Sequence, residues 1–343
     1  MSSELERLFT FYGLVSLSVK APPSITNFLH SEWQPFEVSV DGVDPDFAVT
    51  WTQRHRSRRD AARHIPKNLS AGWYKGCFWQ ATTATENGRV YIEYSSIPRS
   101  RYLFRDSCLE PLVLSSLESK GFHTLHASSL LIGGKAWAFC GRPRSGKTVL
   151  ALMGTQRGHT LLSDDVAILE SGRVYPYPVP ARIYLHNYRQ RELFEGLISP
   201  EVTREFVLNL IISATSLGTV RIPTRLFFPH TAPTFSSKLK DPYPLGGLFL
   251  LMRRNKTPSV EPCRDKTSAV KEVAGSLPPH GAAVTKPTKS QHVGGDRPWQ
   301  SLDSTIGNLV EEGNAFEVNI PNKPTVEEWK RIFDMVLEVT SHD

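Results

Sequence analysis

Residues 141–148 read Gly-Arg-Pro-Arg-Ser-Gly-Lys-Thr, a complete G-x4-G-K-[ST] phosphate loop. Glycines let consecutive backbone N–H groups turn toward a phosphate, and the helix that follows adds its positive N-terminal end. Lys147 would neutralise the β- and γ-phosphates, and the Thr148 hydroxyl would bind Mg²⁺. An apolar segment precedes the loop and a helix-forming segment follows it, which favours a site for ATP over a structural turn. The predicted phosphate-binding residues are Gly141, Arg142, Pro143, Arg144, Ser145, Gly146, Lys147 and Thr148.

Two adjacent carboxylates, Asp164 and Asp165, follow the loop after one helix-forming segment. Such pairs are common in surface turns, but this pair ends an apolar segment, 159–163, that has the pattern of a short strand. Neighbouring side chains of a strand point to opposite sides, so one carboxylate can face the γ-phosphate while the other orients a neighbour. A carboxylate that reaches an acceptor hydroxyl can take its proton during phosphoryl transfer, so the pair favours that chemistry.

A histidine is also expected near the loop. Gly133-Gly134 is a two-residue hairpin signal between the strand-like segments 124–132 and 135–140. In that hairpin His126 lies opposite Gly141, at the mouth of the phosphate site. The sequence leaves two interpretations open, a structural histidine or one that contacts phosphate or tunes an aspartate.

The elements that must position these residues form a mixed α/β fold. Residues 1–105 form a strand-rich, mostly antiparallel N-terminal module, and residues 106–252 form the phosphate-loop core. Residues 253–300 are polar and are expected to be a mobile insertion or linker. Residues 301–343 supply a strand and a helix that pack on the core. The expected strands of the N-terminal module are 12–19, 36–40, 47–51, 73–80 and 89–94.

Within the core we expect a helix at 108–120 and, after the phosphate loop, a helix at 148–156 and a hairpin that turns at 170–173. Thr325 and Glu328 form a capping box that opens the last helix, whose apolar face consists of Val326, Trp329, Ile332, Phe333, Val336 and Leu337. The remaining expected elements are helices at 189–197 and 200–213 and strands at 220–228, 245–252 and 316–320.

The composition is that of an ordinary globular protein: 343 residues, 40% hydrophobic and 22% charged. No apolar run approaches the roughly 20 residues of a membrane span, and the first residues do not have the pattern of a signal peptide. We therefore expect a cytoplasmic protein without a membrane partner. Its four cysteines form no C-x-x-C pair, so neither a zinc site nor a disulfide framework is indicated, and Cys140 is expected to be a packed thiol.

The net charge of +6 is concentrated in one stretch, residues 54–67. It is either a solvated surface segment or a docking surface for an acidic peptide or protein; nucleic acid is a distant third because no nucleic-acid motif accompanies it. The basic side chains are Arg54, His55, Arg56, Arg58, Arg59, Arg63, His64 and Lys67.

Three segments, 126–129, 141–148 and 156–165, together resemble the core of the HPr kinase/phosphorylase family, which shares a fold with phosphoenolpyruvate carboxykinase. The resemblance implies that Asp164 is the general base toward an acceptor serine and that Asp165 is its companion at the metal. It also implies that Lys147 is the phosphate lysine, that Thr148 carries the Mg²⁺ hydroxyl, and that His126 lies near the phosphates.

The chain also departs from this family. The bifunctional enzymes carry a further metal-binding glutamate, whereas residues 178–185 here contain no acidic residue. The layout is closer to that of HPr-kinase-like proteins of bacterial gene clusters, some of which phosphorylate a serine of a ribosomally made precursor such as a lasso peptide. The resemblance thus implies an ATP- and Mg²⁺-dependent serine kinase acting on a peptide or small protein. A kinase for a free hydroxy amino acid and a nucleotide-binding switch without transferase activity are the alternatives, and homo-oligomers are common in this fold.

Overall fold

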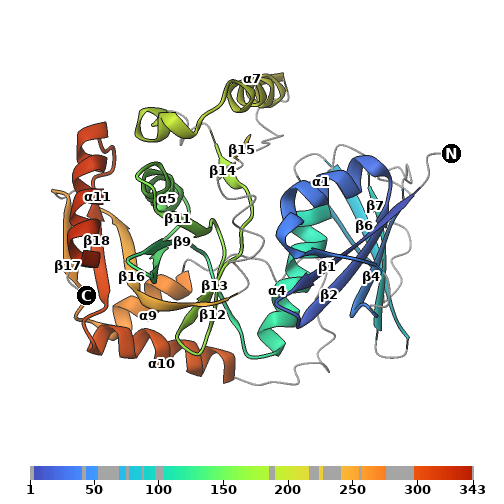
Figure 1. The fold of residues 1–343 in the computed structure, drawn as a ribbon, viewed down its shortest axis with the longest axis horizontal. Coiled ribbons are helices and arrows are strands. Elements are labelled where there is room, and N and C mark those ends of the chain that lie inside the picture. Colours follow the sequence, from blue (N-terminus) through green and yellow to red (C-terminus); the bar gives the residue numbers. More distant parts are fainter. Residues whose placement is uncertain are drawn as a thin grey trace. The chain divides into compact units, whose positions relative to one another are not determined.

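The computed structural model describes residues 4–40, 44–52, 69–74, 77–86, 89–96, 104–184, 190–215, 224–226, 241–254, 257–275 and 297–341. The chain divides into two compact units (Figure 1). One comprises Met1–Lys120 and Pro279–Gly295, and the other comprises Gly121–Pro278 and Asp296–Asp343. The basic stretch 54–67 lies outside the described residues. No helix in the described ranges combines the length and the apolar composition that crossing a bilayer requires.

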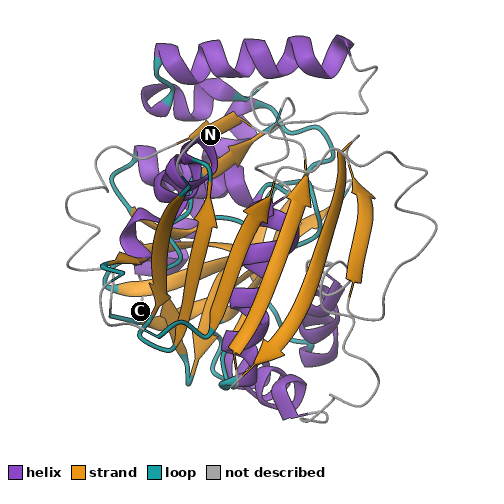
Figure 2. Cartoon of the chain, turned by 90° about the vertical axis from the view of Figure 1, so that its right-hand side faces the viewer, coloured by secondary structure: helices purple, strands orange, loops and turns teal. Residues whose placement is uncertain are grey.

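The first unit is built on a seven-stranded sheet with the order β3-β1-β2-β4-β7-β6-β5 (Figure 2). The pairs β2–β4 and β4–β7 are parallel and the other neighbouring pairs are antiparallel, which confirms a mostly antiparallel module. The strands are β1 (Leu5–Phe11), β2 (Val15–Ala21), β3 (Glu37–Val38), β4 (Phe47–Thr52), β5 (Leu69–Tyr74), β6 (Cys77–Glu86) and β7 (Arg89–Ser96).

Two details of this unit differ from the sequence prediction. The strand expected at 12–19 begins only at Val15, as β2, because Tyr12 and Gly13 adopt left-handed conformations with φ of 57° and 72° and reverse the chain between β1 and β2. An unpredicted helix, α1 (Pro23–Trp33), follows β2. Its stability comes from packing: Trp33 is fully buried, and its ring meets those of Phe9 and Phe11 edge to face.

The expected helix at 108–120 is present, but it begins earlier. A π-helical turn (Arg105–Leu109) leads into α4 (Glu110–Ser119). The division between the two units falls after this helix, at Lys120, and not before it near residue 105. Lys120 itself belongs to the first unit, where its ammonium donates a hydrogen bond of 2.5 Å to the carbonyl of Leu14.

The second unit has a nine-stranded mixed sheet with the path β11-β9-β10-β16-β13-β12-β8, in which β18 joins β16 and β17. Strand β16 lies parallel to both β10 and β18, whereas β9 and β10 form the predicted antiparallel hairpin. The fold is therefore mixed α/β, as expected. The strands are β8 (His123–Leu125), β9 (Ala127–Ile132), β10 (Lys135–Cys140), β11 (Thr160–Ser163), β12 (Ala167–Glu170), β13 (Arg173–Tyr175), β16 (Tyr243–Arg253), β17 (Ser259–Pro262) and β18 (Ala315–Ile320).

Two layers of helices cover this sheet (Figure 1). Helices α5 (Lys147–Gln156) and α11 (Val326–Ser341) share one apolar cluster with the sheet, and α9 (Lys266–Gly275) and α10 (Arg297–Glu311) share the other. The capping box is confirmed: the Thr325 amide donates to the Glu328 carboxylate at 2.7 Å, and the Glu328 amide donates to the Thr325 hydroxyl at 3.2 Å. The predicted apolar face of α11 is buried or partly buried.

The expectation of a mobile insertion or linker at 253–300 is wrong for its described part. Strand β17 and helix α9 lie within it, and α10 begins inside it. The apolar residues of these helices are few and widely spaced, yet they form one buried stripe on each, with Ala269 and Val273 on α9 and Ile306 on α10. Residues 276–296 lie outside the description.

A smaller assembly completes the second unit. Strands β14 (Ala181–Ile183) and β15 (Thr224–Leu226) form a separate two-stranded antiparallel sheet among the described strands. Between them come a 3₁₀ helix (Arg191–Leu197) and α7 (Pro200–Thr215), which match the helices expected at 189–197 and 200–213. Of the strand expected at 220–228, only 224–226 is described.

Candidate active site

The phosphate loop connects β10 to α5, as the sequence predicts, and its glycines are sterically required. Gly141 and Gly146 have φ of 153° and 119°, where side chains with a Cβ are strained. A Cβ at position 141 would lie 2.8 Å from the Ser145 hydroxyl and 2.9 Å from the carbonyl of Leu251. A Cβ at position 146 would collide with the indole of Trp329, which rises from α11. The loop is therefore held in place by neighbouring elements.

Lys147 begins α5 and is almost fully buried. Its ammonium donates hydrogen bonds to the carbonyls of Gly141 at 2.5 Å and Arg142 at 3.2 Å. Burial lowers the pKa of this ammonium, and the charges of Asp165 and Asp164 act against that change. We expect the ammonium to exchange its hydrogen bonds to the loop carbonyls for bonds to phosphate oxygens when a nucleotide binds.

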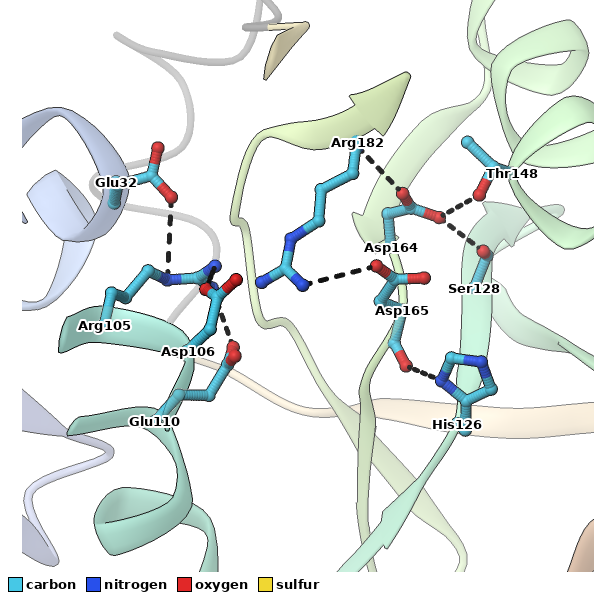
Figure 3. A network of polar contacts seen from close by, with 10 residues as sticks. All are labelled: Glu32, Arg105, Asp106, Glu110, His126, Ser128, Thr148, Asp164, Asp165 and Arg182. Carbon is cyan, nitrogen blue, oxygen red and sulfur yellow. Dashed lines mark hydrogen bonds and ion pairs between the residues drawn. The ribbon is translucent and has the colours of Figure 1, made fainter. Parts of the chain in front are cut away.

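Asp164 is buried and accepts three hydrogen bonds (Figure 3). Its Oδ1 accepts from the Ser128 hydroxyl at 2.6 Å and from the Thr148 hydroxyl at 3.0 Å. Its Oδ2 accepts from the backbone amide of Arg182 at 3.3 Å. Burial and, next, repulsion from Asp165 raise the pKa of the Asp164 carboxyl to about 6, although the three hydrogen bonds oppose this.

Asp165 points elsewhere. Its backbone adopts the left-handed conformation, with φ of 68°, two residues after the end of β11. Its carboxylate is 30% exposed and lies 3.8 Å from the guanidinium of Arg182. Both aspartates lie after the end of β11, so the strand alternation that was expected to separate their side chains does not apply to them.

His126 does not occupy the position opposite Gly141 that the hairpin register suggested. The predicted register holds as far as Ala127 opposite Cys140. The chain then bends at His126, because the preceding strand, β8, pairs with β12 and not with β10. The His126 Nδ1–H donates to the backbone carbonyl of Asp165 at 3.0 Å. The histidine therefore supports the strained backbone of an aspartate.

Three residues of the site were not singled out from the sequence. Ser128 bonds Asp164, and Ser129 shares a 2.6 Å hydrogen bond with Ser163, so these hydroxyls link β9 to β11. Buried serines in an otherwise apolar strand were the available signal. Arg182 had no such signal, because β14 reaches Asp164 only through the tertiary fold.

Helix α9 also reaches the phosphate loop. The guanidinium of Arg142 lies 3.6 Å from the Glu272 carboxylate of this helix. A segment that the sequence suggested was a linker therefore contacts a predicted phosphate-binding residue. Because the Arg142 side chain is 73% exposed, we treat this pair as a weak tether.

The donor set fits a Mg²⁺ ion. The site offers the Thr148 hydroxyl and the Asp164 carboxylate in direct contact, with a second carboxylate on the next residue. Mg²⁺ is usually held by one or two carboxylates together with substrate phosphates. Among the described residues, no group of three or more acidic, histidine or cysteine side chains gathers to hold a metal by itself.

Comparison with known proteins adds a structural likeness. The sequence matches no protein-family model and no curated protein. Among solved structures, the chain is similar to the HPr(Ser) kinase/phosphatase from Coxiella burnetii, with 14% identity over 64% of this chain and 97% of that chain. The TM-score is 0.25. Because that value is low, the chemistry below rests on the residues of this chain.

Proposed function

We propose that this chain is an ATP- and Mg²⁺-dependent kinase that transfers the γ-phosphoryl group to a serine hydroxyl of a peptide or small protein. The observation that carries the proposal is the 3.0 Å hydrogen bond between the Thr148 hydroxyl and Asp164. It joins the loop that would bind the phosphates to a carboxylate pair that could serve the metal and the acceptor. A module that only binds nucleotide has no need for a carboxylate pair beside the phosphates.

The two aspartates have different roles in this proposal, and the roles are the reverse of those that the resemblance implies. Both oxygens of Asp164 are engaged by donors and its side chain is buried, so it is suited to hold Mg²⁺ together with Thr148. A divalent cation would relieve both the burial and the repulsion that raise the pKa of Asp164. Asp165 is partly exposed and can reach an acceptor hydroxyl, so we infer that Asp165 is the general base.

In the proposed reaction, Asp165 accepts the proton of the serine hydroxyl. The serine oxygen forms a bond to the γ-phosphorus while the bond from that phosphorus to the β,γ-bridging oxygen breaks, and ADP leaves. Lys147 and the loop amides hold the phosphates, and bound Mg²⁺ supplies neutralisation of their charge. His126 keeps Asp165 in position through its carbonyl.

The experiment that tests this proposal measures label transfer from γ-labelled ATP with Mg²⁺. The acceptor panel holds serine-bearing peptides, an HPr-like carrier protein and free serine, and the variants are Asp164→Asn and Asp165→Asn. We expect label on a peptide or protein with the wild type. Asp165→Asn should bind nucleotide but lose transfer, and Asp164→Asn should lose the Mg²⁺ dependence of nucleotide binding.

The other outcomes assign different functions. Label on free serine alone would identify a small-molecule kinase. Tight ATP binding without label on any acceptor would favour a nucleotide-binding switch. If Asp164→Asn abolished transfer with normal Mg²⁺-dependent binding while Asp165→Asn remained active, the roles of the two aspartates would return to those implied by the resemblance.

A further inference from the structure

Arg182 touches both aspartates through different parts of the residue. Its backbone amide donates to Asp164, and its guanidinium lies 3.8 Å from the Asp165 carboxylate (Figure 3). Its side chain is 16% exposed, so the charge lies in partly desolvated surroundings. The residue belongs to β14, which is outside the nine-stranded sheet that carries the phosphate loop. A separate element therefore brings a positive charge to the carboxylate pair.

The negative charges of the site indicate a function for the Arg182 guanidinium. The Thr148 hydroxyl of the phosphate loop donates to Asp164 at 3.0 Å, so phosphates bound by the loop would also approach the carboxylates. The negative charges of phosphate and carboxylate repel strongly when they approach each other in a partly buried site. A cation close to both Asp165 and the transferring group would offset this repulsion, and the Arg182 guanidinium already faces Asp165.

We propose that Arg182 contacts the transferring phosphoryl group, to which its guanidinium moves from Asp165. This inference rests on the proposed kinase function and adds a residue to it. A guanidinium presents a planar fork of donors that matches the oxygens of a phosphate. The charge that spreads over those oxygens during transfer is what an arginine stabilises in other phosphoryl-transfer sites. The exchange also releases Asp165 to accept the proton of the acceptor hydroxyl.

The geometry suits such a movement. The 3.8 Å separation is longer than a hydrogen bond, so the guanidinium is attracted to Asp165 without being fixed on it. The backbone of Arg182, in contrast, is fixed on the carboxylate that also bonds Thr148. The backbone of Arg182 would therefore stay in place when the guanidinium changes partners. Replacement of the side chain leaves the anchoring amide in place, which makes Arg182→Ala a clean test.

The test does not require the acceptor to be known. The affinity for Mg·ADP is measured by calorimetry with and without fluoroaluminate, an anion that stands in for the transferring phosphoryl group. The variants are Arg182→Ala, Arg182→Lys and, as a matched control, Arg331→Ala, which removes an exposed arginine from α11. Thermal unfolding of each variant shows whether it is folded.

With the wild type and Arg331→Ala, fluoroaluminate should tighten the binding of Mg·ADP. Arg182→Ala should bind Mg·ADP normally but lose about tenfold to a hundredfold of that tightening, the loss expected for one charge-assisted hydrogen bond. Arg182→Lys should restore only part of it, and guanidinium ion added to Arg182→Ala should recover some. If Arg182→Ala keeps the full tightening, the inference is wrong. If the wild type does not bind Mg·ADP, the proposed function fails first.

Discussion

The two units each contain a cluster of buried carboxylates, and the clusters are held in opposite ways (Figure 3). In the first unit the guanidinium of Arg105 is only 1% exposed and meets a carboxylate with each nitrogen. It donates to Glu110 at 2.7 Å and to Asp106 at 3.0 Å, and it lies 3.5 Å from Glu32. The same guanidinium lies over the Trp33 ring, 5.8 Å from its centre. This cluster contains its own cation.

In the second unit, the donors that bond the buried Asp164 are uncharged: two hydroxyls and one backbone amide. Its nearest charged neighbour along the chain, Asp165, is of the same sign and helps to raise the pKa of Asp164. A buried carboxylate without a bonded cation costs stability. The comparison shows that the first cluster neutralises its buried carboxylates with a guanidinium, whereas the second bonds its buried carboxylate with uncharged donors, as the proposed binding of a cation requires.

The largest effect is expected from removing the cation of the first cluster. Arg105→Met should destabilise the protein by about 3–5 kcal/mol, because it leaves buried carboxylates without their partner. Urea unfolding measures this change. The control, Lys20→Ala, removes an exposed pair with Glu4 and should cost little. A loss for Arg105→Met as small as that of the control would mean that the cluster is not essential to the fold.

A substitution in the second cluster is expected to change the stability in the opposite direction. Asp164→Asn should stabilise the protein without metal at pH 7, because it removes an ionised carboxylate that burial disfavours. The folded pKa of about 6 lies above the ordinary value of 3.8 for an aspartate, so the folded state binds the proton more tightly. The contribution of Asp164 to stability therefore falls as the pH rises from 3.8 to about 6 and is constant above that window.

Urea unfolding between pH 3 and pH 8 checks this prediction, since the decline should be present in the wild type and smaller in Asp164→Asn. Mg²⁺ and nucleotide should reverse the order of stability, because only the wild type gains their full binding energy. A variant that is less stable than the wild type at every pH would show that the hydroxyls and the amide, and not a cation, satisfy this carboxylate.

A smaller effect on stability is expected from a substitution in the phosphate loop, which contacts the second cluster through Thr148. Gly146→Ala should destabilise by about 1–3 kcal/mol through its positive φ and the collision with Trp329, and it should weaken nucleotide binding. Unfolding and calorimetry measure both. Adding Trp329→Leu should relieve the collision but not the backbone strain. A double variant no better than Gly146→Ala would assign the whole effect to the backbone.

Local patterns in the sequence were sufficient for the features that depend on neighbouring residues. The Gly133-Gly134 turn set the β9–β10 register, Thr325 and Glu328 capped α11, and the phosphate loop follows a strand and opens a helix. The features that were missed depend on distant partners. The bend at His126 arises because β8 pairs with β12, and Arg182 enters the site from a strand that pairs with β15. No residue near either position signals these pairings.

The indole of Trp329 beneath Gly146 has a consequence for the order in which the chain is made. The loop is complete in sequence at Thr148, but the side chain that supports it belongs to a helix that begins at Val326. The phosphate loop is therefore synthesised long before Trp329, the side chain that supports it. We expect nascent chains that end before α11 to lack nucleotide affinity, so the proposed nucleotide site would form only at a late stage of synthesis.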